Sequence, residues 1–257
     1  MRRFSLALTG IIFLIISIIL FTLVTWSPLV VLAASLSDPE IRFAILLSLV
    51  TSIVSTLVCI AVAVPVAYAL ARYQFPGKQV ANLVLTIPLA LPPLVAGIAL
   101  LLFFGTTPWG KALEHAGLGV VFTPLGIIVA EVFVNLPYMI RIMRSAFFGV
   151  NPRFEHVAKT LGCTDTGAFF QVTLPMARHG LIAGSVITWS KAMGEFGAVL
   201  MLAGATTMRT ETLPIALYLN ISAGDLDLAV AAATILILIS LITLCTVEYL
   251  DRDVTVF

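Results

Sequence analysis

Long apolar runs alternate with short polar connections along the whole chain, and this pattern predicts an all-α integral membrane protein. Six of the runs are close to the ~20 residues that a helix needs to cross a bilayer. We place these spans at residues 7–33, 43–71, 80–104, 125–142, 181–202 and 228–247. Together they predict one transmembrane domain that covers residues 1–257.

The first run follows Met1-Arg2-Arg3, so it could also be read as a secretory signal cut near the stretch "LAAS". Its apolar part is much longer than the roughly 7–15 residues of a signal core. We therefore expect a retained membrane helix.

Composition supports a membrane protein and excludes several other classes. The chain is 60% hydrophobic and 11% charged, and its mean hydropathy is +1.12. Soluble domains are roughly one quarter charged. A net charge of +1 provides no basic face for nucleic acid. The cysteines and histidines are scattered, so we expect neither a disulfide framework nor a metal site.

The basic residues predict the orientation of the six spans, because cytoplasmic loops carry an excess of Lys and Arg. With six spans both termini lie on one side. That side carries Arg2, Arg3, Arg72, Lys78, Arg141, Arg144, Arg153, Lys159, Arg178 and Arg252. The other side carries only Arg42, Lys111 and Arg209, and Lys191 falls inside a span. We therefore expect both termini in the cytoplasm.

The stretch "GTTPWGKA", residues 105–112, is close to a phosphate-binding P-loop in its spacing. It follows a membrane helix rather than a strand and falls in an outer loop, where ATP is absent. Pro108 lacks a backbone N–H, and Ala112 lacks the hydroxyl that would bind magnesium. The stretch therefore predicts an outer turn, and any ATP must be used by another chain.

The longest cytoplasmic connection, residues 144–180, has structure of its own. Phe154, Val157, Ala158 and Leu161 repeat at helical spacing and form one apolar stripe. Gly162 can end that helix in a left-handed cap, and Thr164 or Asp165 can start a second helix that stops at Leu174-Pro175. Periodicity alone leaves two alternatives: a docking knob for a partner, or a hairpin on the lipid headgroups.

This connection resembles the cytoplasmic signature of ABC importer permeases. The signature reads Glu-Ala-Ala, three residues, Gly, nine residues, Ile-x-Leu-Pro. Here His156-Val157-Ala158 is followed by Gly162 and by Val172-Thr173-Leu174-Pro175, and the acid stands one position earlier, at Glu155. In that family the knob inserts into the ATP-binding subunit. The resemblance implies an ATPase-coupling segment at residues 154–175 that includes Phe154, Glu155, His156, Val157, Ala158, Leu161, Gly162, Leu174 and Pro175.

Three further stretches are similar to molybdate and tungstate permeases, with sulfate permeases as close relatives. They are "YALARYQFPGK" (68–78), "IPLALPPLVAGIALLLFFG" (87–105) and "GEFGAVLMLAGATTMRTETLPIALYLNISAGDLDLA" (194–229). The resemblance implies the type I importer permease fold and a homodimer in a prokaryotic inner membrane. It also implies two ATPase subunits, which hold ATP and Mg, and an extracytoplasmic oxyanion-binding protein. The chain itself would bind no cofactor and catalyse no reaction.

Polar residues and prolines inside the spans indicate a path or gate. Prolines in span three should kink it, and Lys191 with Glu195, like Glu131 with Asn135, stand four apart and can pair on one helix face. The candidate path residues are Pro88, Pro92, Pro93, Glu131, Asn135, Ser190, Lys191, Gly194 and Glu195. The alternatives are a kink that only shapes packing and polar pairs that only join helices.

Two other classes of protein were weighed against an importer subunit. A stand-alone secondary carrier could use Lys191, Glu195 and Glu131 as ion relays, but it would need no cytoplasmic knob. An intramembrane enzyme would need a nucleophile with a base or a metal, and the spans contain no such set. No residues converge on a tetrahedral anion, so we expect specificity to lie mainly in a separate binding protein.

Overall fold

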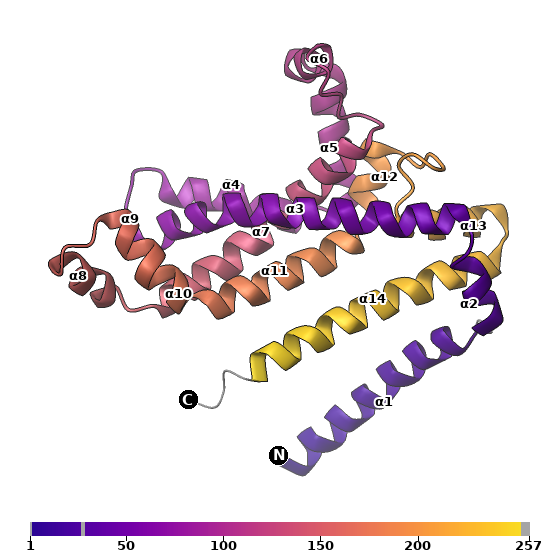
Figure 1. Ribbon diagram of the computed structural model, residues 1–257, viewed down its shortest axis with the longest axis horizontal. Helices are drawn as coiled ribbons and strands as arrows, with labels where there is room; N and C mark the ends of the chain where they lie inside the picture. Colours follow the sequence, from indigo (N-terminus) through magenta and orange to yellow (C-terminus); the bar gives the residue numbers. More distant parts are fainter. Residues whose placement is uncertain (1, 27–28, 253–257) are drawn as a thin grey trace.

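The computed structural model describes residues 2–26 and 29–252, and within these ranges the chain is helical with no β-strand (Figure 1). The long helices are α1 (Arg2–Trp26), α3 (Pro39–Arg72), α7 (Pro124–Gly149), α11 (Arg178–Met193) and α14 (Leu226–Arg252). The shorter membrane helices are α4 (Lys78–Ala90), α5 (Pro93–Thr106), α12 (Gly197–Ala203) and α13 (Leu213–Ala223). The connecting helices are α2 (Leu29–Ser35), α6 (Pro108–His115), α8 (Arg153–Thr160), α9 (Asp165–Ala168), a π-helix (Phe169–Thr173) and α10 (Leu174–Met176).

Three helices begin with a polar capping residue followed by proline. Asp38 accepts from the N–H groups of Glu40 and Ile41 at the start of α3. Thr107 and Thr123 accept from the glycine three residues on, at the starts of α6 and α7. The side-chain oxygen accepts from an N–H that has no partner within the helix. Proline in the first turn costs no helical hydrogen bond, because the N–H that it lacks would have had no acceptor there. These local signals fix where the spans start.

In the described part of the chain, four helices are long and apolar enough to cross a membrane, and two bent pairs raise the number to six if each pair is one span. The pairs are α4 with α5, bent by 114°, and α11 with α12, bent by 58°. The predicted spans 80–104 and 181–202 fall on these pairs. The prolines were expected to kink span three. The structure turns it much more sharply, at Leu91-Pro92, so that α5 leaves the bundle sideways (Figure 1).

Two predicted span boundaries differ from the helices. The first span was placed at residues 7–33, but α1 ends at Trp26 and α2 begins at Leu29, with residues 27–28 outside the described part of the chain. The fourth was placed at 125–142, whereas α7 continues to Gly149. Counting apolar residues stops the span at the first arginines, but a helix continues through arginine without penalty.

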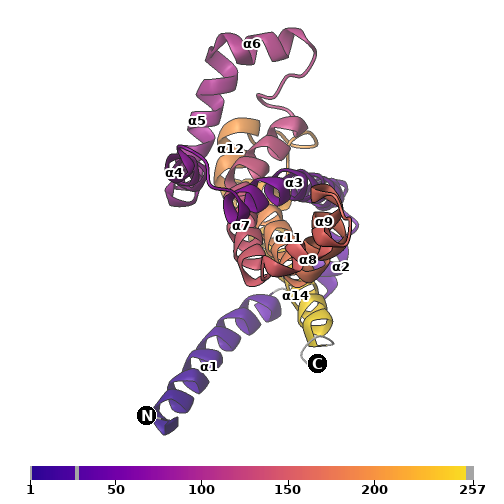
Figure 2. The same cartoon turned by 90° about the vertical axis from the view of Figure 1, so that its left-hand side faces the viewer.

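The bundle is built from α3, α7 and α11, which pack against one another along their lengths. Small residues on α3, among them Cys59, Ala63 and Ala67, are fully buried against Met139 and Met143 of α7. In a membrane the hydrophobic effect does not drive helices together, because lipid tails are as apolar as the side chains. Small side chains instead let the helices pack closely. Helix α1 stands apart from this bundle (Figure 2), and its apolar window is 0% buried.

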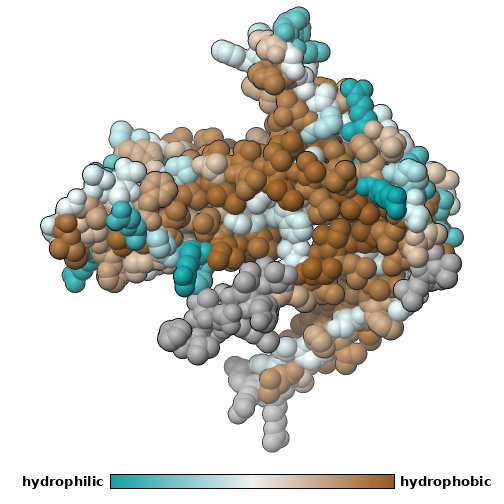
Figure 3. Space-filling model, viewed as in Figure 1, coloured by the Kyte–Doolittle hydropathy of each residue, from teal (hydrophilic) through white to brown (hydrophobic). Residues whose placement is uncertain are grey.

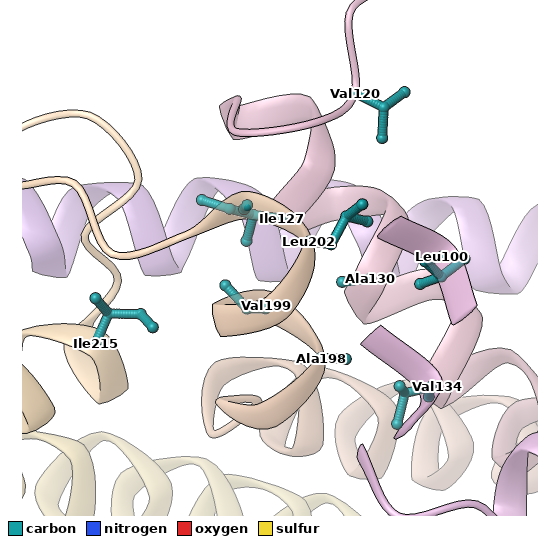
Figure 4. Close-up of a cluster of buried hydrophobic side chains, with 11 residues drawn as sticks. Leu100, Val120, Ile127, Ala130, Val134, Ala198, Val199, Leu202 and Ile215 are labelled. Carbon is teal, nitrogen blue, oxygen red and sulfur yellow. The ribbon is translucent and has the colours of Figure 1, made fainter. Parts of the chain in front are cut away.

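The second halves of the two bent spans pack on each other without room for side chains. A Cβ on Gly97 of α5 would lie 2.8 Å from the Ala198 backbone, and one on Gly197 of α12 would lie 2.9 Å from Pro93. Leu100, Val199 and Leu202 complete an apolar cluster with Ile127 of α7 (Figure 4). The two breaks therefore lie side by side, locked by a glycine on each helix.

Hydropathy divides the surface into zones (Figure 3). Apolar side chains cover the middle of the molecule, and polar ones gather at the end that carries α8 and α9 and on α6. This distribution is that of a multi-pass membrane protein with polar ends.

We expect Gly97→Ala to destabilise the protein, because even one methyl group would contact the backbone of Ala198. Overpacking costs about 1–3 kcal/mol. Gly105→Ala is the control on the same helix, since its Cβ would meet only Val121 at 4.0 Å. Thermal unfolding in detergent should show a lower midpoint for Gly97→Ala alone, and equal midpoints for both variants would contradict the glycine seam.

Candidate functional site

A helical knob, residues 153–176, lies at one end of the bundle beyond α3 and α7 (Figure 1). Helix α8 ends as predicted: Gly162 has φ +96°, the Gly162 N–H donates to Lys159 O, and the Cys163 N–H donates to Ala158 O. This is a Schellman cap, which requires a residue with positive φ. Thr164 then caps α9 by accepting from the Gly167 N–H at 3.0 Å. The predicted order of helix, glycine turn and second helix is confirmed.

The second helix of the knob does not stop at Leu174-Pro175, and that prediction is wrong. Helix α9 passes into the π-helix Phe169–Thr173, and α10 carries the helical path to Met176. The Leu174 N–H donates to Phe169 O, five residues back, so the wider turn accommodates Pro175 in the first turn of α10. Single π turns of this kind are frequent at functional sites.

The π-helix turns Phe169 into the bundle. Its ring lies 4.7 Å from that of Tyr68 on α3 and 6.0 Å from that of Phe147 on α7, and Tyr68 and Phe147 are 5.7 Å apart. Edge-to-face aromatic pairs add about 0.5–1.5 kcal/mol beyond the area they bury. The aromatic cluster attaches the second half of the knob to two spans.

A buried ion pair attaches the first half of the knob. Glu155 of α8 is 6% exposed, and its Oε1 accepts from Arg72 Nε at 2.7 Å while its Oε2 accepts from Tyr68 Oη at 2.9 Å. Arg72 also donates to Val150 O at 2.8 Å. Each oxygen of the carboxylate is thereby satisfied by α3, and α8 cannot shift without breaking charged hydrogen bonds.

Burial is the largest single influence on Glu155 and opposes its ionisation. The hydrogen bonds to its carboxylate, first of all from Arg72, and the positive charge of Arg72 together outweigh burial and lower the pKa of this carboxyl below its ordinary value. The pair is therefore charged at neutral pH. The stability that it contributes is present above the ordinary carboxyl pKa and is lost only as the pH falls through the lowered value.

The outer face of the knob is apolar and open. Phe154, Val157 and Leu161 are 50%, 56% and 82% exposed, and Phe170 adds another exposed ring. Of the predicted stripe, only Ala158 faces inward. His156 and Pro175 are exposed and Leu174 is half-buried. A contiguous apolar face outside the bundle marks an interaction surface.

The intramembrane acid of α7 is committed to α3. Glu131 is 2% exposed, and its Oε1 accepts from Thr51 Oγ1 at 3.1 Å. Glu131 and Asn135 were expected to pair, but no hydrogen bond joins them among the described residues. Both polar atoms of Asn135, which is 1% exposed, have no protein partner. Interior water is the usual partner of such groups.

The predicted pair of Lys191 and Glu195 is wrong. Lys191 Nζ lies 4.1 Å from the centre of the Tyr138 ring on α7, and Glu195 Oε1 accepts from the Ala198 N–H at 3.1 Å. The described ion pairs do not include these two residues. The reason is the break after Met193: four-residue spacing places two side chains on one face only while the helix continues.

The remaining candidate path residues cluster around the two breaks. Pro92 and Pro93 are exposed at the start of α5, and Pro88 lies inside α4. Gly194 caps α11, and Ser190 lies half-buried one turn earlier. The described residues contain no group of three His, Cys, Asp or Glu side chains that could hold a metal.

The sequence did not identify four partners: Arg72, Tyr68, Thr51 and Tyr138. Arg72 was counted only as a cytoplasmic charge. Arg72 stands in the last turn of α3, and the knob carries two acids, Glu155 and Asp165; of these only Glu155 lies in α8 beside the apolar stripe, and this position is the signal that could have paired it with Arg72. The stretch at residues 105–112 runs from the end of α5 into helix α6, and Thr107 Oγ1 accepts from the Gly110 N–H that a phosphate cradle would need.

Comparison with known proteins identifies the family. Residues 63–256 match the family described as "Binding-protein-dependent transport system inner membrane component". A sulfate transport system permease protein, CysW, of Synechocystis is 32% identical over 85% of this chain and 79% of its own. A molybdenum transport system permease protein, ModB, of Mycobacterium bovis is 35% identical over 80% of this chain and 78% of its own.

A solved structure shows the same fold. It is described as a bacterial alginate ABC transporter in complex with an alginate pentasaccharide-bound periplasmic protein. One of its chains matches 99% of this chain and 96% of its own length, with a TM-score of 0.72 and 17% identity.

We expect Arg72→Met to cost about 3–5 kcal/mol, because it leaves a buried carboxylate without its partner. Adding Glu155→Gln should restore most of the loss, since no charge then remains buried. Thermal unfolding of the two single variants and the double variant closes the cycle. Additive losses would contradict a coupled pair.

Proposed function

The chain belongs to the family of binding-protein-dependent transport system inner membrane components, and we propose that it is the membrane subunit of an ATP-driven oxyanion importer. This family is that of ABC importer permeases, whose members are non-enzymatic membrane subunits.

The knob carries the proposal. It presents Phe154, Val157 and Leu161 outward while Glu155 holds it to Arg72. The exposed apolar face of α8 can bind a partner, and the buried ion pair behind it fixes α8 to α3. A movement of the partner would therefore be transmitted to the spans. We propose that this face inserts into a cleft of the ATPase subunit, which binds ATP and Mg. The alternative, a hairpin on lipid headgroups, would not need an ion pair that fixes the angle between α8 and α3.

The cargo is proposed from the relatives. One is described as a sulfate permease and another as a molybdenum permease, and their identities to this chain are 32% and 35%. Sulfate, molybdate and tungstate are tetrahedral divalent oxyanions. We propose molybdate or tungstate first and sulfate second. A stand-alone secondary carrier is the third possibility, and the knob argues against it.

The assembly proposed has two copies of this chain, two ATPase subunits and an extracytoplasmic oxyanion-binding protein, in the inner membrane with both chain termini in the cytoplasm. Closure of the ATPase subunits draws the two knobs together. Through the ion pair between α8 and α3, that movement tilts α3 and the helices packed on it, and so turns the path from inward-open to outward-open.

We expect Gly162→Val to uncouple the transporter while the spans still insert. A β-branched residue resists the φ of +96° that Gly162 adopts, at a cost of about 1–2 kcal/mol, and it would redirect the exposed stripe. Co-purification of the ATPase subunit should weaken, or ATP turnover should no longer respond to loaded binding protein.

Gly117→Val is the matched control for this variant. Gly117 also has a positive φ, +80°, and open surroundings, but it lies between α6 and α7, away from the knob. Gly117→Val should keep co-purification and stimulated turnover. Wild-type coupling in Gly162→Val would remove residues 154–175 as the coupling element.

The proposed orientation predicts opposite labelling of two lysine positions. A cysteine at Lys78 should react only from the cytoplasmic side and one at Lys111 only from outside, in a chain without Cys59, Cys163 and Cys245. Impermeant thiol reagents applied to intact and to inverted vesicles measure this. Labelling of the Lys111 position from the cytoplasm would reverse the orientation.

A further inference from the structure

We propose that Lys191 is the residue through which the translocation path contacts the oxyanion, and that Tyr138 positions its ammonium group. The inference rests on the proposed function, since it requires that the cargo be an anion. The anion would be contacted by one charged group, the Lys191 ammonium on α11. Tyr138 on α7 holds this group, a contact that the four-residue spacing of Lys191 and Glu195 does not reveal.

Lys191 lies deep in a span. It is the fourteenth residue of α11, which begins at Arg178, so about 20 Å of helix axis separates it from the cytoplasmic end. A hydrocarbon core is about 30 Å thick. A cation at such depth must pair with an acid or face a water-filled space.

No acid neutralises this cation within 4 Å among the described residues. The nearest candidate in sequence, Glu195, is buried, and its Oε1 accepts from the first turn of α12, at the Ala198 N–H. The other acid of the spans, Glu131, is bonded to Thr51. The ring of Tyr138 attracts the ammonium at 4.1 Å, and a neutral ring does not cancel its charge.

The helix face that carries Lys191 is partly exposed. Lys191 is half-buried, and both Ile187 and Gly194, on the same helix face, are exposed in the single chain. The break that follows also lies against the break of the other bent span, because Gly197 approaches Pro93. A charge at the meeting point of two broken spans is where an anion would leave the outer half of the path for the inner half.

Uptake by the complete transporter tests the proposal. The permease, its ATPase subunits and its binding protein are reconstituted in vesicles, and radioactive molybdate and sulfate are the probes. Lys191→Met should lower uptake per ATP hydrolysed about tenfold or more, which corresponds to the loss of one charge-assisted hydrogen bond. Lys191→Arg should remain within about threefold of wild type for the same reason.

Tyr138 has its own readout. Tyr138→Phe keeps the ring and should keep uptake, whereas Tyr138→Leu should lower it without changing co-purification of the ATPase subunit. Lys111→Met, an exposed lysine of α6, is the matched control and should transport as wild type. Equal uptake in Tyr138→Phe and Tyr138→Leu would overturn the positioning role.

Chemical rescue protects the test against misfolding of Lys191→Met. In a chain without native cysteines, Lys191→Cys is treated with an aminoethyl reagent, which restores a positive charge, or with a methyl reagent, which does not. Recovery of uptake with the aminoethyl reagent alone supports the proposal. Recovery with both reagents or with neither overturns it.

The outcomes separate this inference from the proposed function. A wild-type transporter that takes up neither molybdate nor sulfate with ATP would refute the proposed function and the inference together. A wild-type transporter that takes up either anion, with Lys191→Met within about twofold of it, would refute the inference alone.

Discussion

The ion pair between Arg72 and Glu155 is the constraint that fixes the knob to the bundle, and the coupling that we propose depends on it. A short helix on two flexible connections would turn about its own axis and could not tilt a span. Two charged side chains buried at 2.7 Å prevent that, because separating them would leave each charge desolvated and unpaired. The aromatic contacts of Phe169 with Tyr68 and Phe147 add a second attachment point, and two points fix an orientation where one does not.

Close contacts also hold together the two bent spans, α4–α5 and α11–α12. The α4–α5 and α11–α12 pairs are broken, and a break inside a membrane exposes backbone groups that must find partners. Part of the cost is met locally: Glu195 accepts the Ala198 N–H, and Pro93 has no N–H to expose. Close packing between α5 and α12 stabilises the broken region further. Gly97 and Gly197 allow it, because a Cβ at either position would clash with the other helix. The continuous helices α3 and α7 join the knob at one end of the bundle to the two bent spans at the other.

Local signals in the sequence predicted local structure well. Apolar run length indicated the spans. Gly162 was predicted as a cap, and Thr164 or Asp165 as the next one, because a cap acts through its own backbone or the next few residues; the structure selects Thr164. Contacts across the fold were not predictable in this way. Arg72 and Glu155 are far apart in sequence, so no periodicity relates them. The predicted pair of Lys191 and Glu195 is wrong although these residues are close in sequence. The four-residue rule assumes an unbroken helix, and α11 ends at the intervening glycine, Gly194.

The disposition of acidic groups agrees with a path for an anion. A carboxylate facing such a path would repel a divalent oxyanion, and three buried acids accept hydrogen bonds from other groups, although Oε2 of Glu131 has no protein partner. Glu131 accepts from Thr51, Glu195 from the backbone of α12, and Glu155 from Arg72 and Tyr68. Lys191 alone among these charged groups is held by a ring rather than by an opposite charge. Among the described residues no acid lies within 4.0 Å of the Lys191 ammonium, and the ring of Tyr138 stabilises this group without cancelling its charge. The bend after Met193 separates Lys191 from Glu195, and in the proposed path it leaves the charge of Lys191 for the anion.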